Sequence, residues 1–307
     1  MKFLLFFIMT ASLFANVDGA LAYPEKVDAD EISKQVYFVN HQFYVKNQIL
    51  KSTKKHSLLI VKKQHGKKAR AMNADRFLNN DFNDGVTKSK DLVVFNSGKL
   101  KGTGVLAREF VDETKSLEIM MWLPALRKVR RMAEPSKNMG YSEADVAFLE
   151  EAKLRRLSDD TYELLGTQVR KIEFGQIELE ASEMDRYTKA LPQEKKTISV
   201  EVHALKATPK EDAWYDYRID YIDTKHFTNY ETKFYVADKV VKSVYRQWEK
   251  IEELSDERAY MWTYWYSINE ETKYETVNYI PKEIIKTNDE NIRPSFWSEK
   301  TLSNIKR

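Results

Sequence analysis

The sequence predicts a mainly β fold of the α+β class, built on antiparallel strands with few helices. Segments with period-two alternation recur about every ten residues, a spacing typical of a sandwich or a barrel. One early segment, residues 29–46, instead has apolar residues at helical spacing. Only nine Gly and seven Pro serve the turns, so long strands are expected. Without a repeat, a low-complexity segment or a linker, residues 23–307 are expected to form a single domain.

Composition narrows the function classes. The chain has 307 residues, of which 42% are hydrophobic and 32% charged, so a folded protein with a substantial core is expected. A net charge of +3, with both signs interspersed, does not indicate nucleic-acid binding. The absence of Cys excludes disulfides, thiolate metal ligands and a Cys nucleophile. We expect no metal and no cofactor.

Residues 1–22 have the pattern of a cleaved export signal. Lys2 supplies a positive charge, residues 3–15 form an apolar run, and residues 20–22 (ALA) place small residues before the cleavage position. The run is too short to span a bilayer stably, and no later run reaches about 18 residues. We therefore expect export and cleavage after Ala22; the alternative is a retained N-terminal anchor.

The helix expected at residues 29–46 follows the acidic residues Asp28, Asp30 and Glu31, which suit a helix N-terminus. Its apolar stripe comprises Ile32, Val36, Val39 and Phe43. Strands are expected at residues 56–73 (a hairpin turning at His65-Gly66), 91–98, 103–110, 117–123, 161–182 (with turns near Gly166 and Gly175), 197–205, 213–223, 233–238 and 240–251 (a hairpin turning at 237–239), 259–269 and 273–281.

The strand at residues 117–123 has one wholly apolar register, which comprises Leu117, Ile119, Met121 and Leu123. We expect this register to face an apolar cavity, with Met120 and Trp122 packed under a helix or loop; a slip of one residue would invert the assignment. A basic cluster follows, formed by Arg127, Lys128, Arg130 and Arg131. These cations either form a solvated turn or bind an anionic headgroup or a partner at the cavity rim.

A second helix is expected from Ser142 to about residue 157. Ser142 and Asp145 resemble a capping box, although Glu or Gln is the usual last member. Its apolar stripe is narrow and comprises Val146, Leu149 and Leu154. Because so few side chains would anchor it, we expect this helix to act as a lid.

Residues 260–267 are apolar in both registers. One register comprises Tyr260, Trp262, Tyr264 and Tyr266, and the other comprises Met261, Thr263, Trp265 and Ser267. An ordinary half-exposed strand has one polar register. The strand is therefore either buried on both faces, or part of a curved sheet in which Tyr260, Trp262, Tyr264 and Tyr266 line an apolar cavity.

Three stretches resemble a known family. They are residues 93–106 (VVFNSGKLKGTGVL), 120–148 (MMWLPALRKVRRMAEPSKNMGYSEADVAF) and 293–302 (RPSFWSEKTL). Within them, the segment LPALRKVRR is the most specific. These stretches are similar to LolA-like outer membrane lipoprotein-sorting proteins. The loop at residues 140–145 (GYSEAD) departs from the family pattern, in which an acid and an aromatic residue precede the final acid.

The resemblance implies a periplasmic half-open β-barrel, a strongly bent antiparallel sheet whose mouth is covered or plugged by helices. It further implies that acyl chains of a lipid or lipoprotein bind inside, on the way toward the outer membrane. An inner-membrane transporter of the resistance-nodulation-division (RND) type and transient membrane contact are the implied partners.

The sequence is compatible to different degrees with three function classes. A carrier needs only an apolar cup, since each buried methylene contributes about 0.8 kcal/mol. An enzyme is not indicated, because none of the five His lies in an H-E-x-x-H motif and no G-x-S-x-G occurs. The alternative to the carrier is a non-carrying periplasmic adaptor or sensor that docks on the transporter.

Overall fold

The computed structural model describes residues 21–54, 56–133 and 156–304. These residues contain one sheet of fifteen strands, in which every ladder is antiparallel. The order along the sheet is β7-β6-β5-β4-β3-β2-β14-β13-β12-β11-β10-β9-β8, while β1 pairs with β3 and β15. The predicted fold class, a bent antiparallel sheet with few helices, is confirmed.

The strands are β1 (Asn47–Leu50), β2 (Leu58–Lys63), β3 (Arg70–Asn79), β4 (Thr87–Phe95), β5 (Gly104–Phe110), β6 (Glu118–Leu123), β7 (Lys128–Met132), β8 (Asp160–Glu173), β9 (Thr197–Pro209), β10 (Tyr217–Asp223), β11 (Asn229–Val236), β12 (Lys239–Lys250), β13 (Tyr260–Asn269), β14 (Glu275–Tyr279) and β15 (Ile285–Thr287). The described helices are α1 (Ala29–Asn40) and α3 (Glu299–Ser303).

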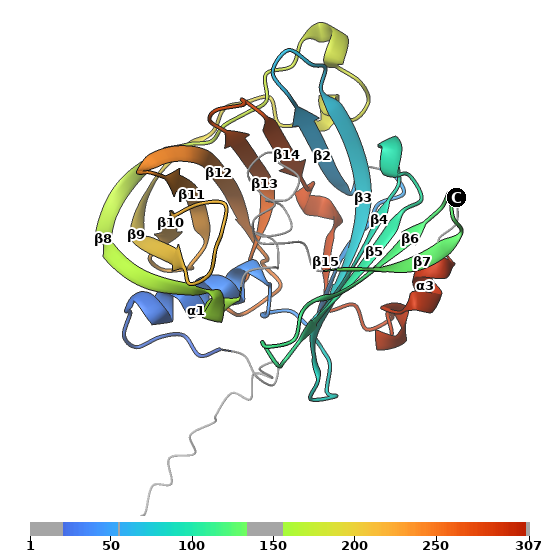
Figure 1. Ribbon diagram of the computed structural model, residues 1–307, viewed down its shortest axis with the longest axis horizontal. Helices are drawn as coiled ribbons and strands as arrows, with labels where there is room; N and C mark the ends of the chain where they lie inside the picture. Colours follow the sequence, from blue (N-terminus) through green and yellow to red (C-terminus); the bar gives the residue numbers. More distant parts are fainter. Residues whose placement is uncertain (1–20, 55, 134–155, 305–307) are drawn as a thin grey trace, which may run out of the picture.

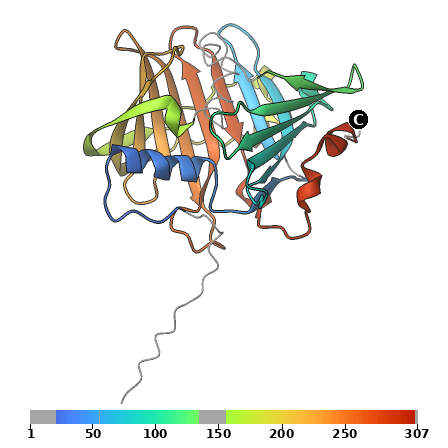
Figure 2. The same cartoon turned by 60° about the horizontal axis from the view of Figure 1, so that its bottom comes forward.

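The sheet is bent most strongly in its C-terminal half. Figure 1 shows β8 to β13 curling around one end of the molecule, while β2 to β7 form a flatter wall opposite them. Figure 2 shows α1 lying across the end of the curled half and α3 on the outside of the flatter wall. The sheet therefore has an inner face, which contacts α1, and an outer face.

Helix α1 begins where the sequence predicts and ends six residues earlier than expected. Asp28 caps it, because its carboxylate accepts a hydrogen bond from the Glu31 backbone N–H at 2.9 Å. Gln42 then adopts a φ of 57° and turns the chain away. The Asn80 side chain stabilises this turn by donating to the carbonyls of Gln42 and Val45, at 2.9 and 3.2 Å. A residue directly after β3, distant in sequence, thus holds the turn in which the helix ends.

The turn predicted near Gly166 is wrong, because β8 runs straight through this position. Gly166 has a φ of 140°, and the pairing of β8 with β9 shifts between Leu164 and Gly166. Glycine tolerates this φ, so the extra residue is accommodated as a β-bulge rather than a turn. The chain does leave the sheet after Glu173, close to the second predicted turn at Gly175.

The predicted hairpin between β11 and β12 is present, and its turn is strained. Ala237 and Asp238 have φ values of 46° and 59°, in the left-handed region that favours glycine. We expect Ala237→Gly to raise the free energy of unfolding by about 0.5–1 kcal/mol, measured by urea denaturation. Ala125→Gly, in a turn where the alanine has no positive φ, should instead lower it. Equal effects of both changes would contradict the strain argument.

A loop at residues 174–196 covers the outer face of β2, β13 and β14. Its side chains Ile177 and Leu191 pack with Val61, Tyr264 and Tyr266 in a separate apolar cluster. Glu183 anchors the loop, since its side chain accepts hydrogen bonds from Lys63 Nζ at 2.8 Å and the Ala69 backbone N–H at 2.7 Å. The sheet is therefore buried on both faces here.

Glu183 should make the stability pH-dependent. The hydrogen bond from Lys63 and those from the backbone N–H groups of Glu180 and Ala69 lower the pKa of Glu183 from 4.5 to about 2. Its stabilisation is therefore complete above about pH 4.5 and is lost as the pH falls through about 2. We expect Glu183→Gln to lower the melting temperature at pH 7 and to flatten its decline between pH 4.5 and 2. A parallel decline in both proteins would contradict this role.

Candidate functional site

Strand register separates the two faces of β4, β5 and β6. On the outer face, Met120 and Trp122 pack in a cluster with Trp297 and Leu302 of the C-terminal segment. Met121 and Leu123 alternate with them and so lie on the inner face. Met120 and Trp122 thus lie beneath a helix-containing segment, as the alternation predicts.

The inner face of this wall carries a row of half-buried apolar side chains. Val93 pairs with Val105, and Val105 pairs with Met121, so the three lie side by side across the strands. Together with Leu123 they form what we call the concave apolar face, which is neither fully buried nor fully exposed. Nearby on the same side, Ile119 is buried. The face is therefore an apolar surface that an additional group could cover.

Leu117, the first member of the predicted register, precedes β6 and is also buried. Leu117 and Ile119 are thus already packed within the protein, and Met121 and Leu123 remain the accessible members. Of the predicted apolar register, only Met121 and Leu123 therefore offer accessible surface to a ligand.

The basic cluster is divided between the two faces. Lys128 pairs with Leu123, and Arg130 pairs with Met121, so both cations border the concave apolar face. Arg131 pairs with Met120 on the outer face and forms an ion pair with Glu118 at 2.7 Å. Arg127 occupies the preceding turn with a φ of 49°. Lys128 and Arg130 thus lie on the side of the concave apolar face and Arg131 on the other, because β7 is a strand whose side chains alternate.

The aromatic register of β13 is also divided, so its four residues do not line one cavity; the strand is instead buried on both faces, the other expected alternative. Trp248 of β12 pairs with Trp262 while Gln247 pairs with Tyr264, so Thr263 is an extra, bulged residue. The bulge reverses the alternation. Trp262 and Trp265 therefore join the inner core, while Tyr264 and Tyr266 lie under the outer loop. Tyr260 packs against the edge of the inner core.

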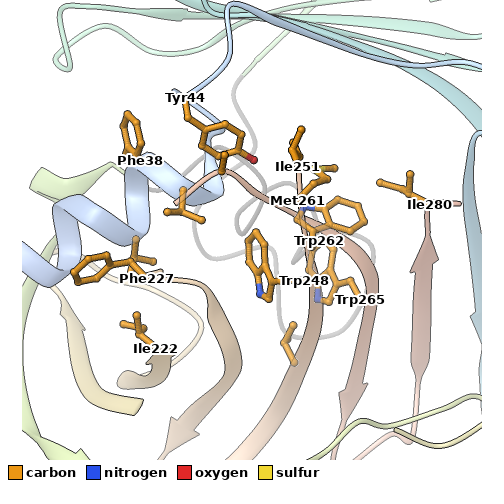
Figure 3. Close-up of a cluster of buried hydrophobic side chains, with 14 of the residues drawn as sticks. Phe38, Tyr44, Ile222, Phe227, Trp248, Ile251, Met261, Trp262, Trp265 and Ile280 are labelled. Carbon is orange, nitrogen blue, oxygen red and sulfur yellow. The ribbon is translucent and has the colours of Figure 1, made fainter. Parts of the chain in front are cut away.

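The interior of the curled half is filled by protein. Figure 3 shows Phe38 of α1, Phe227, Trp248, Met261, Trp262 and Trp265 converging in one buried cluster. A cavity of about 90 Å³ remains beside α1, far smaller than the roughly 300–1,000 Å³ of typical ligand pockets. Within the described ranges, the curled half thus holds a core rather than an open cup.

A charged network that sequence reasoning missed lies beside this cavity. Arg218 is bonded to the carboxylates of Asp160 at 2.7 Å and Asp220 at 3.0 Å. Asp220 also accepts hydrogen bonds from Thr232 at 2.7 Å and Asn229 at 2.8 Å. Such buried charges persist only when paired. The alternation of Arg218 and Asp220 was the available signal, but an alternating polar register is normally solvent-facing.

Helix α1 is tied to the flatter wall by polar contacts as well as by its core residues. The Tyr37 hydroxyl donates to Glu109 of β5 at 2.6 Å, and Lys88 Nζ lies 4.4 Å from the centroid of the Tyr37 ring. Burial and the neighbouring Glu109 carboxylate raise the pKa of Tyr37, so the hydroxyl remains a proton donor. The helix therefore bridges the two halves of the bent sheet.

The predicted lid residues Val146, Leu149 and Leu154 lie outside the described residues. Across residues 21–54, 56–133 and 156–304, no group of His, Asp or Glu is arranged to hold a metal ion. In the same ranges, no helix is long and apolar enough to cross a membrane.

Several solved structures have the same architecture as this chain. A DUF1329 family protein from Desulfovibrio piger superposes with a TM-score of 0.63 at 14% identity, covering 90% of this chain and 100% of that one. A domain described as an outer membrane lipoprotein-sorting protein, from Vibrio parahaemolyticus, gives 0.61 at 13% identity, covering 90% and 98%. A LolA superfamily protein from Nitrosomonas europaea gives 0.53 at 11% identity, covering 90% and 100%.

The chain therefore has a LolA-like fold, as the sequence resemblance implies. At these identities the likeness establishes the fold alone. No protein-family model matches the chain, and no curated protein sequence matches it.

Proposed function

We propose that the protein is a periplasmic carrier that binds acyl chains of a lipid or lipoprotein and moves them toward the outer membrane. The observation that carries the proposal is the concave apolar face. It presents Val93, Val105, Met121 and Leu123 to the inner side of a LolA-like sheet. Lys128 and Arg130 border it, where they can pair with an anionic headgroup.

Because side chains fill the interior of the curled half, we propose that the acyl chain binds to the flatter wall instead. A cavity of about 90 Å³ beside α1 does not accommodate a long chain unless α1 moves. The wall needs no such movement to offer apolar area. In this proposal Trp262 belongs to the supporting core, and Tyr264 and Tyr266 stabilise the sheet from outside.

The remaining parts of the proposal rest on the predicted export signal and on the sequence resemblance to LolA-like proteins. Cleavage after Ala22 would release residues 23–307 as one exported domain that contacts membranes transiently. A transporter of the RND type is the proposed source or acceptor of the cargo. No catalytic step is proposed, because the concave apolar face presents hydrophobic side chains and cations rather than an acid–base pair.

Met121→Asp tests the carrier proposal. Loss of contact with about three methylenes removes roughly 2.4 kcal/mol, so we expect binding of a fluorescent acyl lipid to weaken about fiftyfold. Val169→Asp is the matched control, because Val169 is a 71% exposed apolar residue on β8, at the other end of the sheet. The control should bind as the unchanged protein does. An unchanged affinity in folded Met121→Asp would contradict the assignment.

The filled interior also supports a second candidate, a non-carrying adaptor or sensor that docks on an inner-membrane transporter. Mass spectrometry of organic extracts from natively purified protein separates the two. Co-purified lipid at near-stoichiometric amounts supports the carrier. Lipid-free protein that still binds the periplasmic domain of a transporter supports the adaptor.

A further inference from the structure

A groove of about 480 Å³ lies on the outer face of the sheet, beside the C-terminal segment. One side is formed by β1, β3 and β15, and the other by residues 289–296. Its volume falls within the roughly 300–1,000 Å³ of small-molecule sites. It is separate from the concave apolar face, which lies on the opposite side of the sheet.

The floor of the groove is apolar. Ile49 of β1 pairs with Phe77 of β3, and both are nearly buried. Phe296 packs on Phe77 with ring centroids 5.0 Å apart, and Ile292 joins the same cluster. The floor can therefore shield part of a hydrocarbon chain from water.

Three cations surround this floor. Lys286 pairs with Ile49 across the β1–β15 ladder, and Lys51 Nζ lies 6.0 Å from the centroid of the Phe77 ring. Arg293 completes the set from the C-terminal segment. All three are exposed, and within the part of the chain that the structure describes none of them is joined to a carboxylate by an ion pair. Their charges are thus available to an incoming anion.

The lining of the groove contains one acidic residue, Asp289, against these three cations. Asp289 directs Oδ1 to the backbone N–H and the side-chain amide of Asn291, at 2.9 Å each. Those hydrogen bonds lower the pKa of Asp289, with a smaller contribution from Lys286. The groove therefore combines an apolar floor with an excess of positive charge.

We propose that this groove is a second ligand site, which binds a single-chain anionic amphiphile. The chain lies against Ile49 and Phe77, and a carboxylate or phosphate headgroup is held by Lys51, Lys286 and Arg293. A recess of this volume fits one hydrocarbon chain with a compact headgroup better than it fits the extended surface of a protein partner. The inference does not rest on the proposed carrier function, because no residue of the concave apolar face takes part.

The test is photocrosslinking with two probes, a dodecanoate and a lysophosphatidate that each carry a diazirine on the chain. Peptide mapping by mass spectrometry should place crosslinks within residues 49–53 and 286–296, and the stronger probe identifies the preferred headgroup. We expect the double variant Lys51→Glu, Lys286→Glu to reduce this labelling at least tenfold, because two charge-assisted contacts are replaced by repulsion. Lys67→Glu, Lys68→Glu, in the exposed β2–β3 turn, makes the same charge change and should leave labelling unaltered.

Two further arms make the result decisive. Labelling of the groove should persist in Met121→Asp, so its loss there would assign the crosslinks to the concave apolar face and overturn the proposal. A dodecyl-trimethylammonium probe should not label the groove, and equal labelling would show that charge plays no role. If charge reversal leaves amphiphile labelling intact but abolishes crosslinking to an envelope protein, the groove is a protein-docking site and the proposal is wrong.

Discussion

Replacing Arg218 with methionine is expected to lower the free energy of unfolding by about 3–5 kcal/mol. The guanidinium lies between Asp160, whose side chain is 0% exposed, and Asp220, whose side chain is 8% exposed. Methionine retains much of the apolar volume but leaves two buried carboxylates without this partner. The penalty therefore comes from uncompensated charge rather than from lost packing.

Urea denaturation at pH 7 measures this effect. Arg130→Met is the matched control, since Arg130 is exposed on β7 and its replacement should change stability by less than about 0.5 kcal/mol. Adding Asp160→Asn to Arg218→Met removes one of the orphaned charges and should recover part of the loss. A double variant that is less stable than Arg218→Met would show that the network acts in some other way.

Trp297→Ala is expected to cost about 3–5 kcal/mol and to release the C-terminal segment from the outer face. The indole is 1% exposed and packs with Phe77, Leu92 and Leu106. Its Nε1–H also donates to the Phe77 carbonyl at 2.8 Å. The variant thus loses a large buried side chain and leaves a buried carbonyl without its donor.

Amide hydrogen exchange distinguishes a loss of stability throughout the protein from a local release of the C-terminal segment. In Trp297→Ala the amides of α3 should exchange faster than those of β12 and β13, which lie far along the sheet. Trp297→Phe keeps most of the apolar volume and lacks only the indole N–H, so its loss should be about 1–2 kcal/mol. Comparable losses for Phe and Ala would mean that the hydrogen bond, not the packing, anchors the segment.

The sequence by itself determined those features that depend only on residues close together along the chain. Gly66, in the turn between β2 and β3, has a φ of 70°, and the turn follows from residue types that favour this conformation. The start of α1 follows from the cap at Asp28. Alternation in β6 separated Met120 and Trp122 from Met121, since strand geometry fixes the side on which each side chain lies.

The candidate site was predictable to the extent that it depends on this alternation. Met121 and Leu123 lie on one face, and Lys128 and Arg130 border them. The alternation of β7 places Arg131 on the other face, but only the structure showed that the basic residues form a strand. The outer groove was not predictable, because it joins Lys51 and Lys286, which are distant in sequence.

Tertiary structure alone decided where the regular patterns are interrupted. The bulge at Thr263 separates Trp262 from Tyr264 because β12 and β13 pair with unequal numbers of residues. Asn80 ends α1 from across the fold, and Arg218 is tolerated inside because Asp160 reaches it from another strand. Each of these outcomes depends on a partner far away in the chain. A local pattern specifies what a segment can form, whereas the distant partner determines which face is buried and where the element ends.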